Sequence, residues 1–149
     1  MTLEQQIQED IKAAMRAKDT VALAARRAVK SEILLFKTAE GGTGEITDAD
    51  VLKIIQKLIK QRKETAQVYA DNNRPELAEN ELAEAAAMQQ YLPKQLSPEE
   101  LEARIRDIVA QVGATSIRDM GKVMGLATKQ LAGVADGRAI SAAVKALLG

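Results

Sequence analysis

Apolar residues recur with the helical period of three and four along almost the whole chain. Two such stripes occupy the first 38 residues: Leu3, Ile7, Ile11 and Ala14, and then Val21, Ala25, Val29, Ile33 and Phe36. This spacing places each set on one face of a helix, and no alternating strand pattern occurs anywhere. Three glycines within residues 41–44 interrupt the pattern, because glycine loses much conformational freedom in a helix. The pattern therefore predicts an all-α protein.

Two further helices are predicted before residue 92. Thr47 can cap a third helix with acidic residues in its first turn, and this helix should run to about residue 70. Pro75 suits the first position of a fourth helix. The apolar face of that helix would consist of Leu77, Leu82, Ala85, Ala86, Met88 and Leu92. Four amphipathic helices can bury a common core, so we predict a four-helix N-terminal domain over residues 1–92.

A second, smaller domain is predicted after a short linker. Pro93 ends the fourth helix, and residues 93–97 should form the linker because a residue before proline avoids the helical conformation. Ser97 and Glu100 form a capping box around Pro98, which predicts a helix start. Ser116 and Asp136 are caps for two later helices, the first of which either continues or breaks at Gly125. Residues 98–149 therefore read as a small three-helix domain.

The composition removes several kinds of chemistry. The 149 residues include no Cys and no His, which excludes disulfides, thiol catalysis and histidine-based acid–base chemistry. No phosphate-binding loop or dinucleotide fingerprint occurs, and we expect no catalytic site, metal or cofactor. No apolar run approaches the roughly 20 residues of a membrane span, and the N-terminus lacks a signal-peptide pattern. We therefore expect a cytoplasmic protein.

Positive charge is concentrated in two stretches, although 21 basic residues balance 21 acidic ones overall. Lys53, Lys57 and Lys60 share one face of the third helix, and two neighbouring cations widen this stripe. A similar stripe on the second helix consists of Arg26, Lys30 and Lys37. Such stripes could contact a phosphate backbone, or they could be solvated faces that form salt bridges with the acidic fourth helix. Aromatic residues make up only 2%, which argues against stacking on single strands.

Glycines spaced four apart mark the second helix of the small domain. Gly121 and Gly125 lie inside an amphipathic run, where each costs about 1 kcal/mol relative to alanine. One interpretation is a close helix crossing or a broken helix, and the other is a backbone exposed to a ligand. Further on, Asp136 and Gly137 combine a turn with a helix cap, where free N–H groups could hold an anion.

Four segments together resemble the GatB/YqeY family. They are residues 59–64, 91–97, 119–125 and 135–137, and they span nearly the whole chain in the family's order. The resemblance implies a four-helix domain followed by a small helical domain similar to the tail of the B subunit of tRNA-dependent glutamine amidotransferase. In that enzyme the tail helps to hold the tRNA, while other domains carry out the chemistry. The family positions carried over to this chain are Gly121, Lys122, Gly125, Asp136 and Gly137.

These observations lead to one main hypothesis and two alternatives. The main hypothesis is an RNA-associated accessory protein that binds tRNA or another structured RNA by shape and phosphate contacts. Its candidate RNA-binding residues are Arg26, Lys30, Lys53, Lys57, Lys60, Arg62, Lys63, Lys122 and Lys129. The first alternative follows from the family label, carbon–nitrogen ligase activity with glutamine as amide donor, and makes an amidotransferase or aminoacylation component the partner. The second is a protein–protein adaptor with Met120 and Met124 as adaptable contacts.

Overall fold

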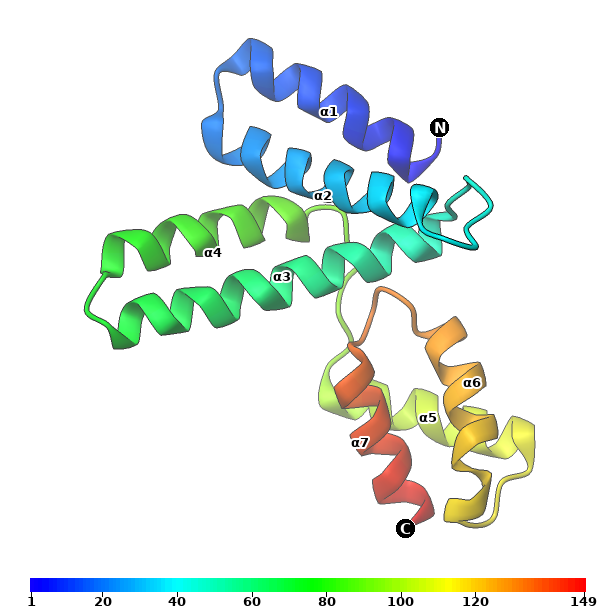
Figure 1. Ribbon diagram of the computed structural model, residues 1–149. Coiled ribbons are helices and arrows are strands. Elements are labelled where there is room, and N and C mark those ends of the chain that lie inside the picture. Colours follow the sequence, from blue (N-terminus) through cyan, green and yellow to red (C-terminus); the bar gives the residue numbers. More distant parts are fainter. The chain divides into compact units, whose positions relative to one another are not determined.

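The computed structural model describes residues 1–149 and contains helices and no strand (Figure 1), which confirms the predicted all-α class. Contacts between residues divide the chain into two compact units: the N-terminal unit, Met1–Leu92, and the C-terminal unit, Pro93–Gly149. The helices of the N-terminal unit are α1 (Leu3–Ala17), α2 (Thr20–Thr38), α3 (Asp48–Asp71) and α4 (Pro75–Gln89). Those of the C-terminal unit are α5 (Pro98–Val112), a 3-10 turn η1 (Ile117–Asp119), α6 (Met120–Gln130) and α7 (Gly137–Leu148).

Side-chain caps begin several of these helices, as the sequence predicts. The Thr47 hydroxyl accepts a hydrogen bond from the Asp50 N–H at 3.1 Å, and the Asp50 carboxylate accepts one from the Thr47 N–H at 3.3 Å. Ser97 and Glu100 exchange the same pair of bonds, both at 3.1 Å, at the start of α5. These reciprocal bonds satisfy N–H groups that have no partner within the helix.

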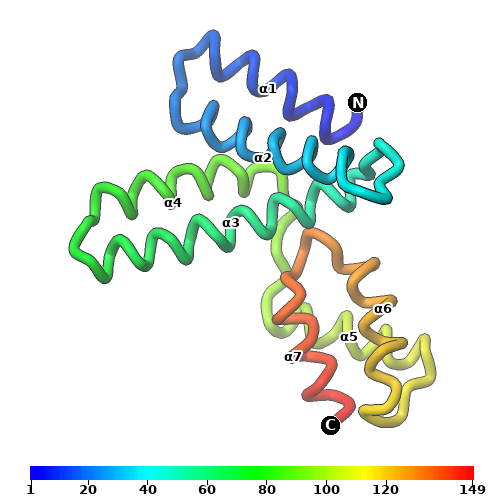
Figure 2. Tube along the Cα trace, viewed as in Figure 1, coloured from blue at the N-terminus to red at the C-terminus, as the bar shows by residue number.

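The N-terminal unit consists of two antiparallel helical hairpins. The α1–α2 hairpin packs on the α3–α4 hairpin, and the Cα trace shows the same order (Figures 1 and 2). Its core consists of Ile7, Ile11, Ala25, Val29, Ile33, Val51, Ile55, Leu58, Ile59, Ala85 and Met88. The end of the α3–α4 hairpin extends beyond α1 and α2 (Figure 1). We call residues 60–84, which lie between the core residues Ile59 and Ala85, the arm. Only two helices form the arm, and Ala66 and Ala78 are the apolar residues buried there.

The predicted buried face of the fourth helix is wrong at several positions. Leu77 and Leu82 are 43% and 48% exposed, and Ala86 is also exposed. Because α1 and α2 do not cover the arm, α4 can bury only the stripe that faces α3 there. Glu84 lies in that stripe and is buried. Phe36 is 43% exposed for a related reason: it lies in the last turn of α2, beyond the core residue Ile33.

The C-terminal unit packs α5, α6 and α7 around one core. This core consists of Leu101, Ile105, Ile108, Val123, Ala127, Leu131, Ile140 and Val144. The helix α6 runs without a break through Gly125, so the alternative in which this helix is interrupted is wrong. Ser116 caps the 3-10 turn that precedes α6 rather than α6 itself.

The first residues of the C-terminal unit are bonded to the loop before α7. The Leu96 N–H donates to the Val134 carbonyl at 2.9 Å, and the Gln95 side-chain amide donates to the Gly133 carbonyl at 2.6 Å. Leu96 also packs against the core of this unit. These two residues of the predicted linker are therefore held by the loop before α7.

No helix of the structure has the length and apolar character needed to span a lipid bilayer.

Candidate nucleic-acid interface

Three lysines of α3 form an exposed row, which we call the lysine stripe. Lys53, Lys57 and Lys60 are all exposed and form no ion pair. At about 100° per residue they fall within an arc of about 60° on the helix. The opposite face of α3 carries core residues such as Ile55, and α1, α2 and α4 all lie on that side of α3 (Figure 1). Within the N-terminal unit the lysine stripe therefore faces away from every other helix.

The two residues expected to widen this stripe lie elsewhere. Arg62 points toward α4, where its Nε atom lies 3.6 Å from a Glu81 carboxylate oxygen and 3.9 Å from one of Glu84. Arg62 therefore forms a structural ion pair with α4. The expectation that it belongs to an open phosphate-binding row is wrong. Its position is about half a turn past Lys60, which places it on the face toward α4. Lys63 is exposed, but it lies about 90° away from the lysine stripe.

The Arg62 pairs compensate for a buried carboxylate. Glu84 is 9% exposed, and the Asn80 side-chain amide donates to it at 3.4 Å. Burial, the largest cause, raises the pKa of Glu84, while the neighbouring Arg62 lowers it and Glu81 raises it. Because the folded state then holds the proton more tightly than the unfolded chain, ionisation of Glu84 opposes folding as the pH rises through that pKa. Arg62 limits this cost.

Most of the predicted stripe on the second helix is bound to α1. The Arg26 guanidinium donates to the Asp10 carbonyl at 2.8 Å, and the Lys37 ammonium pairs with Glu4 at 2.9 Å. Both residues lie on the flank of α2 that packs against α1, which corrects the prediction that they form an open basic row. Lys30 alone of this set is exposed and forms no ion pair.

A tyrosine of the family-like segment at residues 91–97 joins the same contact. The Tyr91 hydroxyl donates to the Asp10 carboxylate at 2.5 Å, so the end of the N-terminal unit is tied to α1. Burial and then this hydrogen bond raise the pKa of Tyr91 well above its ordinary value. Sequence reasoning did not find this contact, because its two partners lie 81 residues apart.

A second group of exposed cations lies on α6. Lys122 and Lys129 are exposed and unpaired, and Gly121 and Gly125 share the outward face with them, all four within an arc of about 100°. A methyl group added at either glycine would meet no atom within 4 Å. The interpretation of these glycines as a close helix crossing is therefore wrong. The other interpretation, an exposed backbone, agrees with this geometry.

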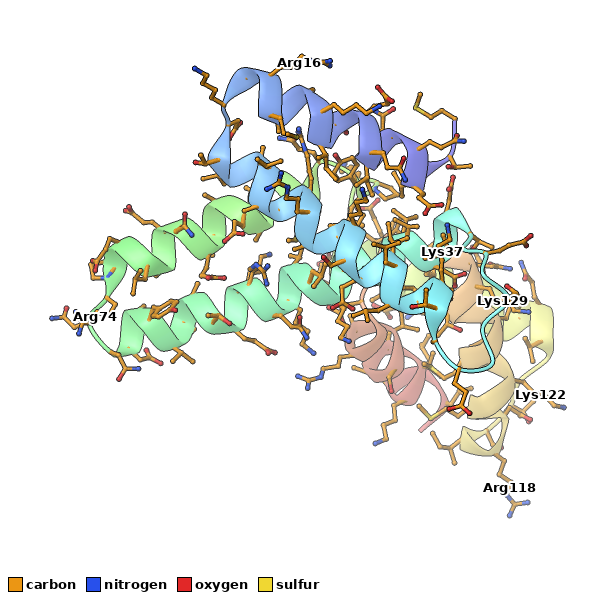
Figure 3. The ribbon with its side chains drawn as sticks, turned by 45° about the horizontal axis from the view of Figure 1, so that its top comes forward. Arg16, Lys37, Arg74, Arg118, Lys122 and Lys129 are labelled. Carbon is orange, nitrogen blue, oxygen red and sulfur yellow. The ribbon has the colours of Figure 1, made fainter.

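Arg118 extends this group, and sequence reasoning missed it. It is exposed, lies one turn before Lys122, and projects with Lys122 away from the C-terminal unit (Figure 3). The spacing of four between the two residues could have identified it. Arg118 belongs to η1, directly before α6, and we call Arg118, Lys122 and Lys129 together the α6 cations.

The other two family-like positions form a helix cap. The Asp136 carboxylate accepts a hydrogen bond from the Ala139 N–H at 2.8 Å and so begins α7. Gly137 is the first residue of that helix and has open space around it. Because the Asp136 carboxylate itself occupies one of the free N–H groups, an external anion has fewer donors here.

Comparison with known families decides where this chain belongs. Residues 4–148 match the family described as Yqey-like protein. The chain belongs to the YqeY-like family. This match covers both units, so the α3 lysines and the α6 cations lie within one family domain.

The YqeY-like chain is similar to curated fungal proteins named "Altered inheritance of mitochondria protein 41, mitochondrial". It is 34% identical over 105 residues to the one from Meyerozyma guilliermondii, covering 70% of this chain and 53% of the relative. It is 36% identical over 86 residues to the one from Pyrenophora tritici-repentis, covering 57% and 46%. The match in Vanderwaltozyma polyspora is 29% identical over 120 residues, covering 76% and 64%. The chain thus spans about half the length of the first two relatives.

No group of three or more Asp and Glu residues is placed to hold a metal ion. A shallow hollow of about 320 Å³ on α5 is lined partly by Glu102 and Arg106, which pair with each other at 2.6 Å. The exposed, unpaired cations of α3 and α6 are grouped on helix faces, and these groups are the candidate contacts for a partner.

Proposed function

We propose that this YqeY-like protein binds structured RNA, with tRNA as the foremost partner, through contacts to phosphates. The observation that carries the proposal is the lysine stripe, in which Lys53, Lys57 and Lys60 are exposed, unpaired and aligned. Lys53 and Lys60 are seven residue steps apart, about 10 Å along the axis of α3. A row of that length can reach successive phosphates, and neutralising them releases condensed counterions.

The α6 cations support the same proposal from the C-terminal unit. They flank a helix face on which Gly125 leaves the backbone bare, so an RNA backbone could approach closely. The resemblance of this unit to an amidotransferase tail that helps to hold tRNA points the same way. A cytoplasmic location, which we expect from the sequence, is part of this proposal. The word "mitochondrial" occurs in the names of the fungal relatives.

Filter binding of the full chain to bulk tRNA at several salt concentrations tests the proposal. Affinity should fall by roughly 0.7–0.9 log units per log unit of salt for each phosphate contacted. The double variant Lys57→Glu with Lys60→Glu should lose about tenfold in affinity at low salt and show a shallower salt slope. Both side chains are exposed, so the variant should keep the circular dichroism spectrum of the original chain.

The matched control is Lys12→Glu with Arg16→Glu, which makes the same change in net charge on exposed positions of α1. Arg16 lies at the far end of α1 from the N-terminus (Figure 3). This control should bind tRNA nearly as the original chain does. Equal loss of affinity in both variants, or no loss in the α3 variant, would remove the lysine stripe from the interface.

The two alternatives are outcomes of related measurements. Amidated product formed by the pure protein from misacylated tRNA, glutamine, ATP and magnesium would favour the carbon–nitrogen ligase alternative. The adaptor alternative relied on Met120 and Met124 as surface contacts. Both are half-buried and pack against the core of the C-terminal unit, which leaves little of either for a partner.

A further inference from the structure

The outward face of α3 carries a segregated pattern of charge. Six exposed residues follow one another at steps of four and three along this face: Lys53, Lys57, Lys60, Glu64, Gln67 and Asp71. The N-terminal half of the row is positive and the C-terminal half is negative. None of its charged residues forms an ion pair within the chain, although the Gln67 amide donates to Asp71 at 2.8 Å.

This pattern is symmetric about position 62 of the sequence. Lys53 and Asp71 lie nine residues on either side of it, and Lys60 and Glu64 lie two residues on either side. Two α3 helices crossing at this position in antiparallel orientation would therefore place Lys53 and Lys60 opposite acids of the other copy. A parallel orientation would instead place lysine opposite lysine. The charges thus select one orientation and one register.

We propose that this face of α3 binds a second copy of the chain in an antiparallel, two-fold symmetric pair. Under that symmetry each contact occurs twice, so the Lys53–Asp71 and Lys60–Glu64 contacts give four ion pairs between the two copies. Lys57 would lie opposite Gln67. The same row supplies both the lysine and the acid of every ion pair. This charge complementarity is the argument that a second copy of the chain binds to this face of α3.

The geometry of α3 permits this pairing. It is a helix of 24 residues, about 36 Å long, and α1, α2 and α4 lie on its other side (Figures 1 and 2). A row at steps of four and three drifts only about 20° per seven residues, so it remains on one face from Lys53 to Asp71. Val68, 58% exposed, lies beside the row and adds apolar surface to the contact.

The proposed contact between the two copies consists mainly of exposed ion pairs, and this determines how the association should depend on salt and protein concentration. Exposed ion pairs each contribute little and are screened by salt. The pair should therefore be weak, depend on protein concentration and weaken as salt is added. Sedimentation equilibrium of the full chain should show an average mass that rises above 16.1 kDa with concentration at low salt and returns toward it at high salt.

Two charge-reversal variants test the register. Lys53→Glu with Lys60→Glu makes the row acidic apart from Lys57 and Gln67. Glu64→Lys with Asp71→Lys makes it basic apart from Gln67. Each variant alone should lose the concentration-dependent rise in mass. An equal mixture of the two should recover it, because every acid of one variant then faces a lysine of the other.

Recovery in the mixture also shows that both variants are folded. The proposal is overturned if the original chain stays monomeric at low salt, or if it associates and the mixture does not. The Glu64→Lys, Asp71→Lys variant keeps all three lysines of the stripe, so it should still bind tRNA while failing to self-associate. The outcome for self-association is thereby separate from the outcome for RNA binding.

Discussion

The basic residues of the two predicted stripes include side chains that turn inward and side chains that stay in solvent. Arg26 and Arg62 turn into the N-terminal unit and contact α1 and α4, whereas Lys53, Lys57 and Lys60 stay in solvent. The planar guanidinium offers five donors and is weakly hydrated, so it suits a half-buried contact better than an ammonium does. The helical period predicted the lysine stripe, because exposure there depends only on α3. It failed for the two arginines, because their partners come from other helices.

The hydrogen bond between Tyr91 and Asp10 should contribute measurably to stability. Tyr91→Phe removes a bond to a carboxylate in a half-buried site, so we expect the free energy of unfolding to fall by about 1–2 kcal/mol. Urea denaturation followed by far-ultraviolet circular dichroism measures this loss.

Tyr69→Phe is the matched control for this prediction. Tyr69 is also half-buried, but its hydroxyl forms no hydrogen bond with the protein. The control should change the free energy of unfolding by less than about 0.5 kcal/mol. Equal effects of the two substitutions would show that the bond to Asp10 adds nothing beyond the phenol ring.

At the scale of helices, the residues at which helices begin were predictable from the sequence. The helix faces that other helices cover were not. The Thr47 cap and the Ser97 capping box each need only four neighbouring residues, and both formed as predicted. Burial of Leu77 and Leu82 failed because it depends on whether a third helix covers the arm. Continuity of α6 was left open for a similar reason. Low helix propensity at Gly125 was outweighed by packing of its neighbours Val123 and Ala127 in the core.

Replacing Gly125 should therefore strengthen α6. The position is helical and open on its outer side, so Gly125→Ala should raise the stability of the C-terminal unit by up to about 1 kcal/mol. If the bare backbone contacts RNA, the same substitution should lower tRNA affinity. Thermal unfolding and filter binding measure the two effects.

Gly113→Ala provides the contrast. Gly113 ends α5 with φ of 73°, a conformation that costs a residue with a side chain about 1 kcal/mol or more. The space around it is also open, so conformation is the main difference between the two sites. Stabilisation by both substitutions, or by neither, would contradict this account of α6.

At the scale of the molecule, each unit has a core of its own. The N-terminal core draws on all four helices of that unit, and the C-terminal core on three. We therefore expect residues 1–92 to unfold cooperatively when expressed alone. Residues 93–149 should be less stable, because a chain of that length buries a smaller share of its surface. Thermal melts of the two fragments test both statements.

The second fragment should begin at residue 93. Starting it at residue 97 would remove the bonds from Gln95 and Leu96 to the loop before α7 and should lower its melting temperature further. A 1–92 fragment without a cooperative transition would show that the N-terminal core is incomplete on its own.

The bonds from Gln95 and Leu96 to Gly133 and Val134 also fix the place at which the chain enters the C-terminal unit. They connect the segment that follows the N-terminal unit to the loop that precedes Asp136. Displacing this loop would break both bonds and release residues 95 and 96 from the C-terminal unit, without first deforming a helix.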